Sequence, residues 1–381
     1  VVDSIIRSII SEIQREKMFI DLIAGARPNF MKIAPIIDAI RQEQERESNI
    51  DFRLVHTGQH YDRNMSGSFF EQLGIPDPDI NLGAGGGTQA EQTAIIMTGY
   101  EKLLMRKPSD LCLVVGDVTS TMACAITARK MSIPVAHVEG GIRSGDWKMP
   151  EEINRVVTDS ITNYFFTTSE HANQNLRDIG VEENRIFFVG NTMIDTLMKH
   201  RHEFRKPDLW DEIDLKEKEF IVITLHRPSN VDEEKTLRVL INEIIQYSRD
   251  LPLIFPVHPR TKKMFNRLGI RNERLFMVDP LGYLEFNYLV ERAKAVITDS
   301  GGITEETTVM NVPCMTLRDS TERPETIHIG TNELLGTEPG AIRPALDKLF
   351  DGEWKSGSIP ELWDGKTSER IVRHVVEILS S

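Results

Sequence analysis

The stretch "AVITDSGGITEETT", residues 295–308, combines a short apolar run, two glycines and the start of a helical pattern. The run 295–298 is typical of a buried strand, and the residues after Gly302 are typical of a helix. The free backbone N–H groups at a helix start favour an anion, and Ser300 could add its hydroxyl. An ordinary Ser or Thr cap is the alternative, but a cap does not require two glycines. We therefore expect a phosphate site here.

Apolar runs of this kind recur along the whole chain and alternate with helical patterns. Near-continuous Val, Ile, Leu and Phe runs are typical of parallel strands covered on both faces, and their alternation with helices predicts βαβ units. The fold class predicted is α/β, with two doubly wound Rossmann-like domains that face each other across a cleft. The expected strands are 18–24, 52–57, 111–116, 134–138, 163–167, 186–189, 220–225, 253–257, 275–278, 295–298 and 314–317.

Length and composition agree with this class. A chain of 381 residues is too long for one compact core and suits two domains. No apolar run is long enough for a membrane span, and the net charge of -13 argues against nucleic acid, so we expect neither membrane nor nucleic acid as a partner. Cys112, Cys124 and Cys314 form no disulfide-like pattern, which favours a reducing compartment and a cytoplasmic location.

The order of the patterns also predicts the domain limits. Residues 1–17 look like an N-terminal helical extension, native or not, and 18–195 should form the N-terminal Rossmann-like domain. Residues 196–365 should form the C-terminal, nucleotide-binding domain. The last segment, 366–381, contains an amphipathic helix that we expect to pack back toward the N-terminal domain.

Polar residues follow nearly every predicted strand. Because ligands bind at the carboxyl ends of parallel strands, this arrangement predicts one shared cleft. Arg27, Lys32 and Arg323 are suited to a diphosphate, although a surface charge is the alternative for each alone. Glu306 could accept hydrogen bonds from a ribose diol, with a solvated helix face as the equal alternative. His137 lies inside a strand and is expected to be structural.

Several longer motifs carry a resemblance to a known family. In chain order they are "GARPNFMKIAPII", "GDVTSTMA", "HVEGGIRSGD", "PEEINR", "VGNTMID", "LHRPSN", "TDSGGITEE" and "RDSTERPE". Together they resemble the non-hydrolysing UDP-N-acetylglucosamine 2-epimerases over about residues 18–380. The resemblance implies a GT-B fold with its active site in the interdomain cleft, a UDP-sugar substrate, no cofactor and a homodimer. No metal-ligand spacing is present in the sequence, so a metal is not indicated.

The resemblance also implies roles for particular residues. The catalytic group implied is Asp117, Glu139, Glu151 and His226, with Arg143 and Glu152 as supporting partners. The substrate-binding group implied is Arg27, Lys32, Phe286, Ser300, Gly301, Gly302, Glu306 and Arg323. A second substrate molecule binds as activator in some members, and the corresponding site would include Gln59, His60 and His258. Ile95 stands where those members have an arginine, and Ala26 and Asn29 replace a usual Thr and Glu.

The chemistry implied is reversible epimerisation at C2 of UDP-N-acetylglucosamine. UDP leaves from C1 as a base removes the C2 proton, a glycal forms, and UDP adds back while a proton reaches the other face of C2. Asp117 is the leading candidate for the base, Glu139 and Glu151 share proton transfer and orientation, and His226 stabilises the leaving diphosphate.

Other functions fit the same sequence less well. A hydrolysing 2-epimerase would release UDP and N-acetylmannosamine, and a related enzyme would act on a UDP-diacetamido-uronic acid. A GT-B glycosyltransferase or a non-catalytic nucleotide-sugar binder would have no evident use for three carboxylates. An NAD-dependent epimerase is disfavoured because no GxGxxG motif follows the first strand.

Overall fold

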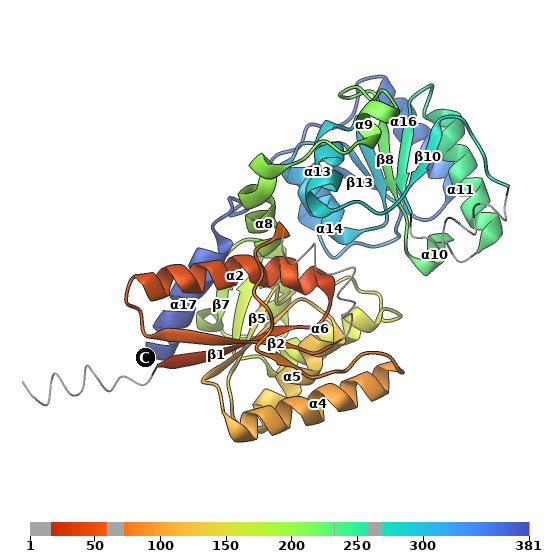
Figure 1. Ribbon diagram of the computed structural model, residues 1–381. Helices are drawn as coiled ribbons and strands as arrows, with labels where there is room; N and C mark the ends of the chain where they lie inside the picture. Colours follow the sequence, from red (N-terminus) through yellow and green to blue (C-terminus); the bar gives the residue numbers. More distant parts are fainter. Residues whose placement is uncertain are drawn as a thin grey trace, which may run out of the picture.

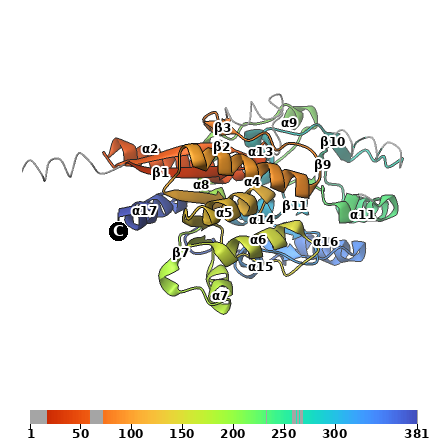
Figure 2. The ribbon, with the colours of Figure 1, turned by 90° about the horizontal axis from the view of Figure 1, so that it is seen from below.

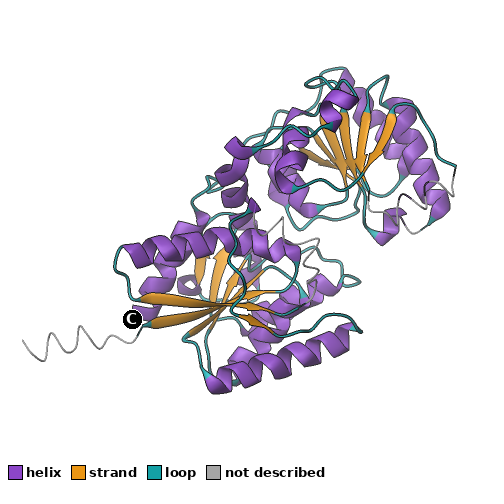
Figure 3. Ribbon diagram, viewed as in Figure 1, coloured by secondary structure: helices purple, strands orange, loops and turns teal. Residues whose placement is uncertain are grey.

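The computed structural model describes residues 17–58, 72–231, 233–257 and 269–380, together with Lys262 and Phe265. These residues form two α/β domains, each built on a parallel sheet with helices on both faces (Figures 1 and 3). Among the described residues, none of the helices combines the length and the apolar character that crossing a membrane requires.

The N-terminal sheet has seven strands in the order β3-β2-β1-β4-β5-β6-β7, and neighbouring strands pair in parallel. Its strands are β1 (Met18–Ala24), β2 (Ile50–His56), β3 (Ile80–Asn81), β4 (Leu111–Val115), β5 (Val135–Val138), β6 (Tyr164–Thr167) and β7 (Ile186–Phe188). Its helices are α2 (Arg27–Glu45), α4 (Gln89–Arg106), α5 (Thr119–Lys130), α6 (Pro150–Ile161), α7 (Glu170–Asp178) and α8 (Thr192–His200). Helices α4, α5 and α6 lie side by side, as the view from below shows (Figure 2).

The C-terminal sheet has six strands in the order β10-β9-β8-β11-β12-β13, again parallel. Its strands are β8 (Ile221–Thr224), β9 (Leu253–Pro256), β10 (Leu275–Val278), β11 (Ala295–Thr298), β12 (Cys314–Thr316) and β13 (Asn332–Leu334). The remaining helices are α9 (Leu209–Glu212), α10 (Pro228–Val231), α11 (Glu234–Tyr247), α13 (Tyr283–Arg292), α14 (Gly301–Val309), α15 (Pro324–His328), α16 (Ile342–Phe350) and α17 (Thr367–Ser380). Short 3-10 turns occur at Glu183–Arg185, Arg201–Glu203 and Pro339–Ala341.

The two-faced burial of the strands is visible in the core. Leu111 and Leu113 of β4 pack into one apolar cluster, whereas the alternate residues Cys112 and Val114 pack into the cluster on the opposite face. This division follows from the two-residue repeat of a strand. The C-terminal sheet divides its side chains between two clusters in the same way. The prediction of parallel strands covered on both faces is confirmed.

Each predicted strand occurs, with bounds that differ from the expected ones by at most two residues. Strands β3 and β13 were not predicted from the sequence. They have two and three residues, each contains an Asn, and both lie at the edge of their sheets. Pairing with a neighbouring strand, rather than an apolar run, defines such short edge strands.

The C-terminal helix α17 packs against α2 and α8 (Figure 1). Its residues Ile371, Val372 and Val375 join the core of the N-terminal domain. Asp195 of α8 accepts hydrogen bonds from the backbone N–H groups of Thr367 at 3.1 Å and of Ser368 at 2.7 Å. Helix α8 also contacts α14 of the other domain. The domain boundary expected after residue 195 falls inside α8, and the domain limits stay a prediction.

Candidate active site

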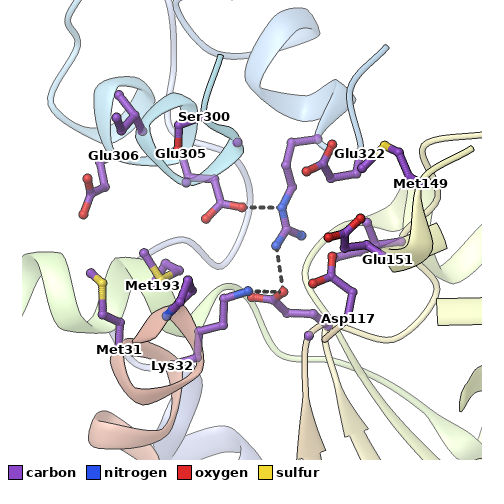
Figure 4. A pocket seen from close by; sticks show the side chains of 18 of the residues that line it. Met31, Lys32, Asp117, Met149, Glu151, Met193, Ser300, Glu305, Glu306 and Glu322 are labelled. Carbon is purple, nitrogen blue, oxygen red and sulfur yellow. Dashed lines mark hydrogen bonds and ion pairs between the residues drawn. The ribbon is translucent and has the colours of Figure 1, made fainter. Parts of the chain in front are cut away.

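A cavity of about 770 Å³ lies between the two domains. The N-terminal domain contributes Lys32, Asp117, Glu139, Glu151 and Arg155 to its lining. The C-terminal domain contributes Tyr283, Phe286, the 300–303 segment at the start of α14, and the charged residues His226, Arg227, Glu305, Glu306, Glu322 and Arg323. Figure 4 shows the carboxylates and cations of the two walls facing one another.

Strand ends position the carboxylates of the N-terminal wall. Asp117 follows β4 and Glu139 follows β5, two strands that are neighbours in the sheet. Gly116 has φ 68, which glycine adopts without strain, and Glu139 itself has φ 70, a conformation that non-glycine residues rarely adopt. Glu151 lies in the first turn of α6, the helix that follows β5. The shared sheet edge therefore brings Asp117 and Glu139 to one wall of the cavity, as the strand-end argument predicted, and the start of α6 adds Glu151 to the same wall.

Glu139 is the centre of a buried ion network that joins the two domains. Its Oε2 accepts a hydrogen bond from Lys32 Nζ at 2.7 Å and contacts Arg323 Nη2 at 3.0 Å. Arg323 also pairs through Nε with Glu305 and donates from Nη1 to Thr168 Oγ1 at 2.9 Å. The side chains of Glu139, Arg323 and Glu305 are each at most 4% exposed. The predicted phosphate cations Lys32 and Arg323 are thus held by carboxylates in this structure.

The two carboxylates beside Arg323 titrate differently. Burial alone would raise the pKa of Glu139, but its two cations, Lys32 and Arg323, hold that pKa below the ordinary value. Burial raises the pKa of Glu305, which contacts Arg323 alone among these cations, above the ordinary value. Glu139 is therefore the ionised member of the pair, and Glu305 is the one that takes up a proton more easily.

Arg155 of α6 holds the second carboxylate, Asp117. The guanidinium pairs with Asp117 Oδ2 through Nη2 and with Glu152 Oε2 through Nη1 at 2.8 Å. Glu152 in turn accepts the backbone N–H groups of Ser144 at 2.9 Å and Gly145 at 3.0 Å. Glu152 therefore ties the loop between β5 and α6 to Arg155, and its role as a supporting partner stays a prediction.

Arg143 and His137 support the same loop. Arg143 Nη1 donates to Asp159 Oδ2 at 2.6 Å, and the same carboxylate oxygen accepts the backbone N–H of Gly141 at 3.0 Å. His137 is buried inside β5, with Nδ1 2.7 Å from Asp159 Oδ1 and Nε2 2.8 Å from the Gly116 carbonyl oxygen. The structural role expected for His137 is confirmed, since it joins the turns that carry Asp117 and Glu139.

Asp299 orients His226 on the C-terminal wall. The carboxylate accepts the backbone N–H of His226 at 3.0 Å and that of Arg227 at 2.9 Å, and it lies 2.7 Å from His226 Nδ1. Burial would raise the pKa of Asp299, but His226 and its other donors lower it below the ordinary value. The His226 side chain is 63% exposed and lines the cavity. Asp299 therefore holds the imidazole ring through Nδ1, while the rest of the ring is accessible from the cavity.

The start of α14, which the sequence predicts to be an anion-type site, lines the cavity. Within the described chain Ser300 makes no side-chain cap hydrogen bond, and its own N–H donates to Thr298 Oγ1 at 3.0 Å. A Cβ at Gly301 would lie 2.9 Å from Glu322 Oε1 and would displace the tip of that side chain, whereas its distance of 3.5 Å to Arg318 Nη1 is an ordinary contact. A Cβ at Gly302 would make only an ordinary contact, 3.9 Å from Met193 Cε.

Glu306 is buried, so the alternative of a solvated helix face is wrong. Its Oε1 accepts hydrogen bonds from the Tyr283 hydroxyl at 2.9 Å and from Asn287 Nδ2 at 3.5 Å. Burial raises the pKa of Glu306 to about 7, although these hydrogen bonds oppose the shift. Phe286 lines the same part of the cavity from α13.

Several residues predicted for the site lie outside the described residues, or have a side chain that is not described. Arg27 is the first residue of α2, and its side chain is not described. Gln59, His60 and His258, the expected activator residues, lie outside the described residues. Ile95 is 43% exposed on α4. From the sequence, no role in the site was predicted for Arg155, Glu305 or Glu322. Their position one to four residues from assigned residues was the available signal.

Two facing α/β domains with a charged cavity between them define a protein of the GT-B-like class. A sequence profile of the UDP-N-acetylglucosamine 2-epimerase family matches residues 42–376. The chain is 39% identical to the UDP-N-acetylglucosamine 2-epimerase of Methanocaldococcus jannaschii, over 93% of this chain and 98% of that protein. It is 37% identical to the UDP-2,3-diacetamido-2,3-dideoxy-D-glucuronate 2-epimerase of Pseudomonas aeruginosa, over 93% and 99% of the two chains.

Solved structures show the same similarity. The crystal structure of the M. jannaschii UDP-GlcNAc 2-epimerase in complex with UDP-GlcNAc and UDP has a TM-score of 0.84 and 39% identity, and the match covers 94% of this chain and 100% of that one. The chain belongs to the UDP-N-acetylglucosamine 2-epimerase family, and the resemblance drawn from its motifs is confirmed at the level of the family.

Proposed function

We propose that this protein interconverts UDP-N-acetylglucosamine and UDP-N-acetylmannosamine by reversible epimerisation at C2. The observation that carries the proposal is the set of three carboxylates, Asp117, Glu139 and Glu151, on one wall of an interdomain cavity whose other wall holds a helix N-terminus and cations. The binding of UDP-GlcNAc and UDP by the M. jannaschii relative supports the choice of ligand.

The reaction needs groups of this kind. The C2 proton is weakly acidic because its neighbour is an amide nitrogen, so its removal must be coupled to departure of UDP from C1. A base removes the proton, the C1–O bond breaks, and the electron pair stays on the phosphate oxygen. Re-addition of UDP with protonation on the other face gives the epimer. Acid–base groups able to serve both faces, together with donors for the departing phosphate, are what this sequence of steps requires.

Each wall has a role in this proposal. Asp117 is the leading base, Glu139 and Glu151 take part in proton transfer and orientation, and His226 stabilises the leaving diphosphate. Glu306 accepts hydrogen bonds from the ribose hydroxyls, and Phe286 lies beside the uracil. The diphosphate is assigned to Arg27, Lys32, Ser300, Gly301, Gly302 and Arg323. Because Lys32 and Arg323 already pair with Glu139 and Glu305, we expect the diphosphate to compete for these cations.

A second candidate substrate is a UDP-2,3-diacetamido-uronic acid, because the P. aeruginosa relative named for that activity is 37% identical to this chain.

We also propose that the protein is a homodimer in the cytoplasm. Sedimentation velocity tests the first of these points, and fractionation of the cells that make the protein tests the second.

The function is tested by incubating the purified protein with UDP-N-acetylglucosamine, without NAD or added metal, and separating the nucleotides by chromatography. We expect a second UDP-hexosamine of the same mass and no accumulation of UDP. Stoichiometric UDP with free N-acetylmannosamine would instead identify the hydrolysing type. Conversion of the UDP-diacetamido-uronic acid alone, with UDP-N-acetylglucosamine unchanged, would move the assignment to the second candidate. A GT-B glycosyltransferase would leave both nucleotide sugars unchanged until an acceptor was added.

A further inference from the structure

Arg318 is a buried arginine behind the first turn of α14 that the proposed mechanism does not use. It follows β12, its side chain is 4% exposed, and its Nη2 donates to Glu322 Oε2 at 2.6 Å. Its Nη1 is fully buried and has no hydrogen-bond partner among the residues that the structure describes. A buried guanidinium N–H without an acceptor destabilises the folded state, so a ligand that could accept its hydrogen bond or balance its charge would explain its presence.

The unpartnered nitrogen lies directly behind the anion-type site. A Cβ built on Gly301 would lie 3.5 Å from Arg318 Nη1, and Gly301 is the first residue of α14, a helix of nine residues whose start lines the cavity. The partial positive charge of the helix N-terminus and the full charge of Arg318 therefore act on the same part of the cavity.

The neighbouring groups at this end of the cavity carry both signs of charge. Burial, and then the nearby charge of Arg318, lower the pKa of Arg227, which also lines the cavity, although nearby carboxylates oppose the shift. Glu322 is the carboxylate between these arginines. Burial would raise its pKa, but Arg318 and Arg155 lower it to about 2. Glu322 is therefore ionised beside Arg318, and Arg318 Nη1 still has no acceptor in the described part of the chain.

Glu322 also joins this site to the opposite wall. Its Oε1 lies 4.0 Å from Arg155 Nη2, the nitrogen that pairs with Asp117 Oδ2. A row of alternating charges therefore runs from Asp117 through Arg155 and Glu322 to Arg318. The row connects the carboxylate proposed as the C2 base with the site proposed for the phosphate.

We propose that Arg318 is a positioning residue of the diphosphate site, whose buried charge stabilises the terminal phosphate and the negative charge that this phosphate gains when the C1–O bond breaks. Arg318 acts through the first turn of α14, and Glu322 limits its effect as a counter-ion. This inference rests on the proposed function, since it requires a UDP-sugar in the cavity.

The inference predicts opposite effects on UDP binding for two substitutions. Arg318→Gln removes the cation and should weaken UDP binding by about tenfold. Glu322→Gln keeps an acceptor for Arg318 but removes the counter-charge, and should tighten UDP binding. A merely structural role for the pair would make both variants bind more weakly. Arg343→Gln is the matched control, because Arg343 is 62% exposed on α16 of the same domain and its nearest carboxylate oxygen is 3.6 Å away.

Isothermal titration calorimetry with UDP and with UMP measures these effects, and thermal unfolding checks that each variant is folded. We expect the loss in Arg318→Gln to be larger for UDP than for UMP, and Arg318→Lys to recover part of it. If Arg318→Gln does not fold, tighter binding by Glu322→Gln still supports the inference and weaker or unchanged binding overturns it. Equal UDP affinity in the wild type and in a folded Arg318→Gln variant overturns it while leaving the proposed function intact. Absence of UDP binding by the wild type overturns both.

Discussion

The Glu139 carboxylate of the N-terminal domain and the Arg323 guanidinium of the C-terminal domain meet across the cleft at 3.0 Å. Lys32 shares the same carboxylate oxygen at 2.7 Å, and Glu305 takes the other side of Arg323. Two cations and two carboxylates therefore form one buried group whose formal charges cancel when all four are ionised. Because the diphosphate is expected to bind the same cations, ligand binding and the state of the Glu139 carboxylate are linked.

Replacement of Glu139 by Gln should separate the effect of this residue on turnover from its effect on UDP binding. The rate of epimerisation should fall by roughly 10²–10⁴-fold, as is usual when a group acting in proton transfer is lost. UDP binding should be unchanged or tighter, because Lys32 and Arg323 lose a competing carboxylate. Initial rates and calorimetry measure the two effects. Glu170→Gln serves as a control, since Glu170 is 65% exposed on α7, and a variant of Glu139 with wild-type turnover would remove this residue from the mechanism.

Asp117→Asn should abolish most of the turnover while leaving UDP affinity within about twofold of wild type, since a base for C2 need not touch the nucleotide. The amide keeps one acceptor for Arg155, so the wall of the cavity should stay folded. Steady-state kinetics and UDP titration test the split. A loss of UDP binding as large as the loss of rate would show that Asp117 has a structural role instead.

The buried carboxyl of Glu325 should make the free energy of unfolding depend on pH. Burial raises its pKa from 4.5 to about 7, and both its carboxylate oxygens are buried without a hydrogen-bond partner in the described part of the chain. The folded state therefore favours the protonated form, so the free energy of unfolding should fall as pH rises from about 4.5 to 7, by up to roughly 3 kcal/mol from this group. Glu325→Gln should be more stable than wild type at pH 8 and equal to it near pH 4.

Thermal unfolding of Glu325→Gln and wild type at these two pH values measures the difference. Glu361→Gln, at an exposed position in the same domain, is the control and should show no pH-dependent gain. If the stability difference at pH 8 equals that at pH 4, the Glu325 carboxyl does not titrate as described.

Asp195 should stabilise the attachment of the C-terminal helix. It accepts hydrogen bonds from the N–H groups of Thr367 and Ser368 at the start of α17, so Asp195→Ala should cost about 1–2 kcal/mol, the usual cost of a lost cap. Urea unfolding measures the loss, and faster hydrogen exchange in α17 than in α16 should accompany it. Unchanged protection of α17 would contradict the assigned cap.

The sequence predicted the elements that carry the site because parallel strands end at a common edge. Asp117, Glu139 and Ser300 lie within two residues of strands whose apolar runs are plain, and the structure places them around one cavity. What the sequence could not predict is pairing between distant residues. Arg323 was expected to face phosphate, but its contacts with Glu139 and Glu305 depend on how the two domains meet, which no local pattern encodes.

The same limit applies to burial within a helix. Glu305 and Glu306 are adjacent in α14, and a local pattern gives both the look of a polar helix face. Both are buried, because α14 packs against α8 and α15 and Glu306 bonds to Tyr283 and Asn287 of α13. The role proposed for Arg318 was hidden for a similar reason, since it depends on an unpartnered nitrogen that lies close to Gly301 at the start of α14.

The central claim is that carboxylates in this cavity exchange the C2 proton of a UDP-sugar while UDP departs and returns. The most direct test is proton NMR of the purified protein with UDP-N-acetylglucosamine in D2O, without NAD or metal. We predict deuterium at C2 of both UDP-N-acetylglucosamine and UDP-N-acetylmannosamine, in a stable mixture of the two. Epimerisation with full retention of the C2 proton, or no change in the presence of a protein shown to bind UDP, would contradict the account.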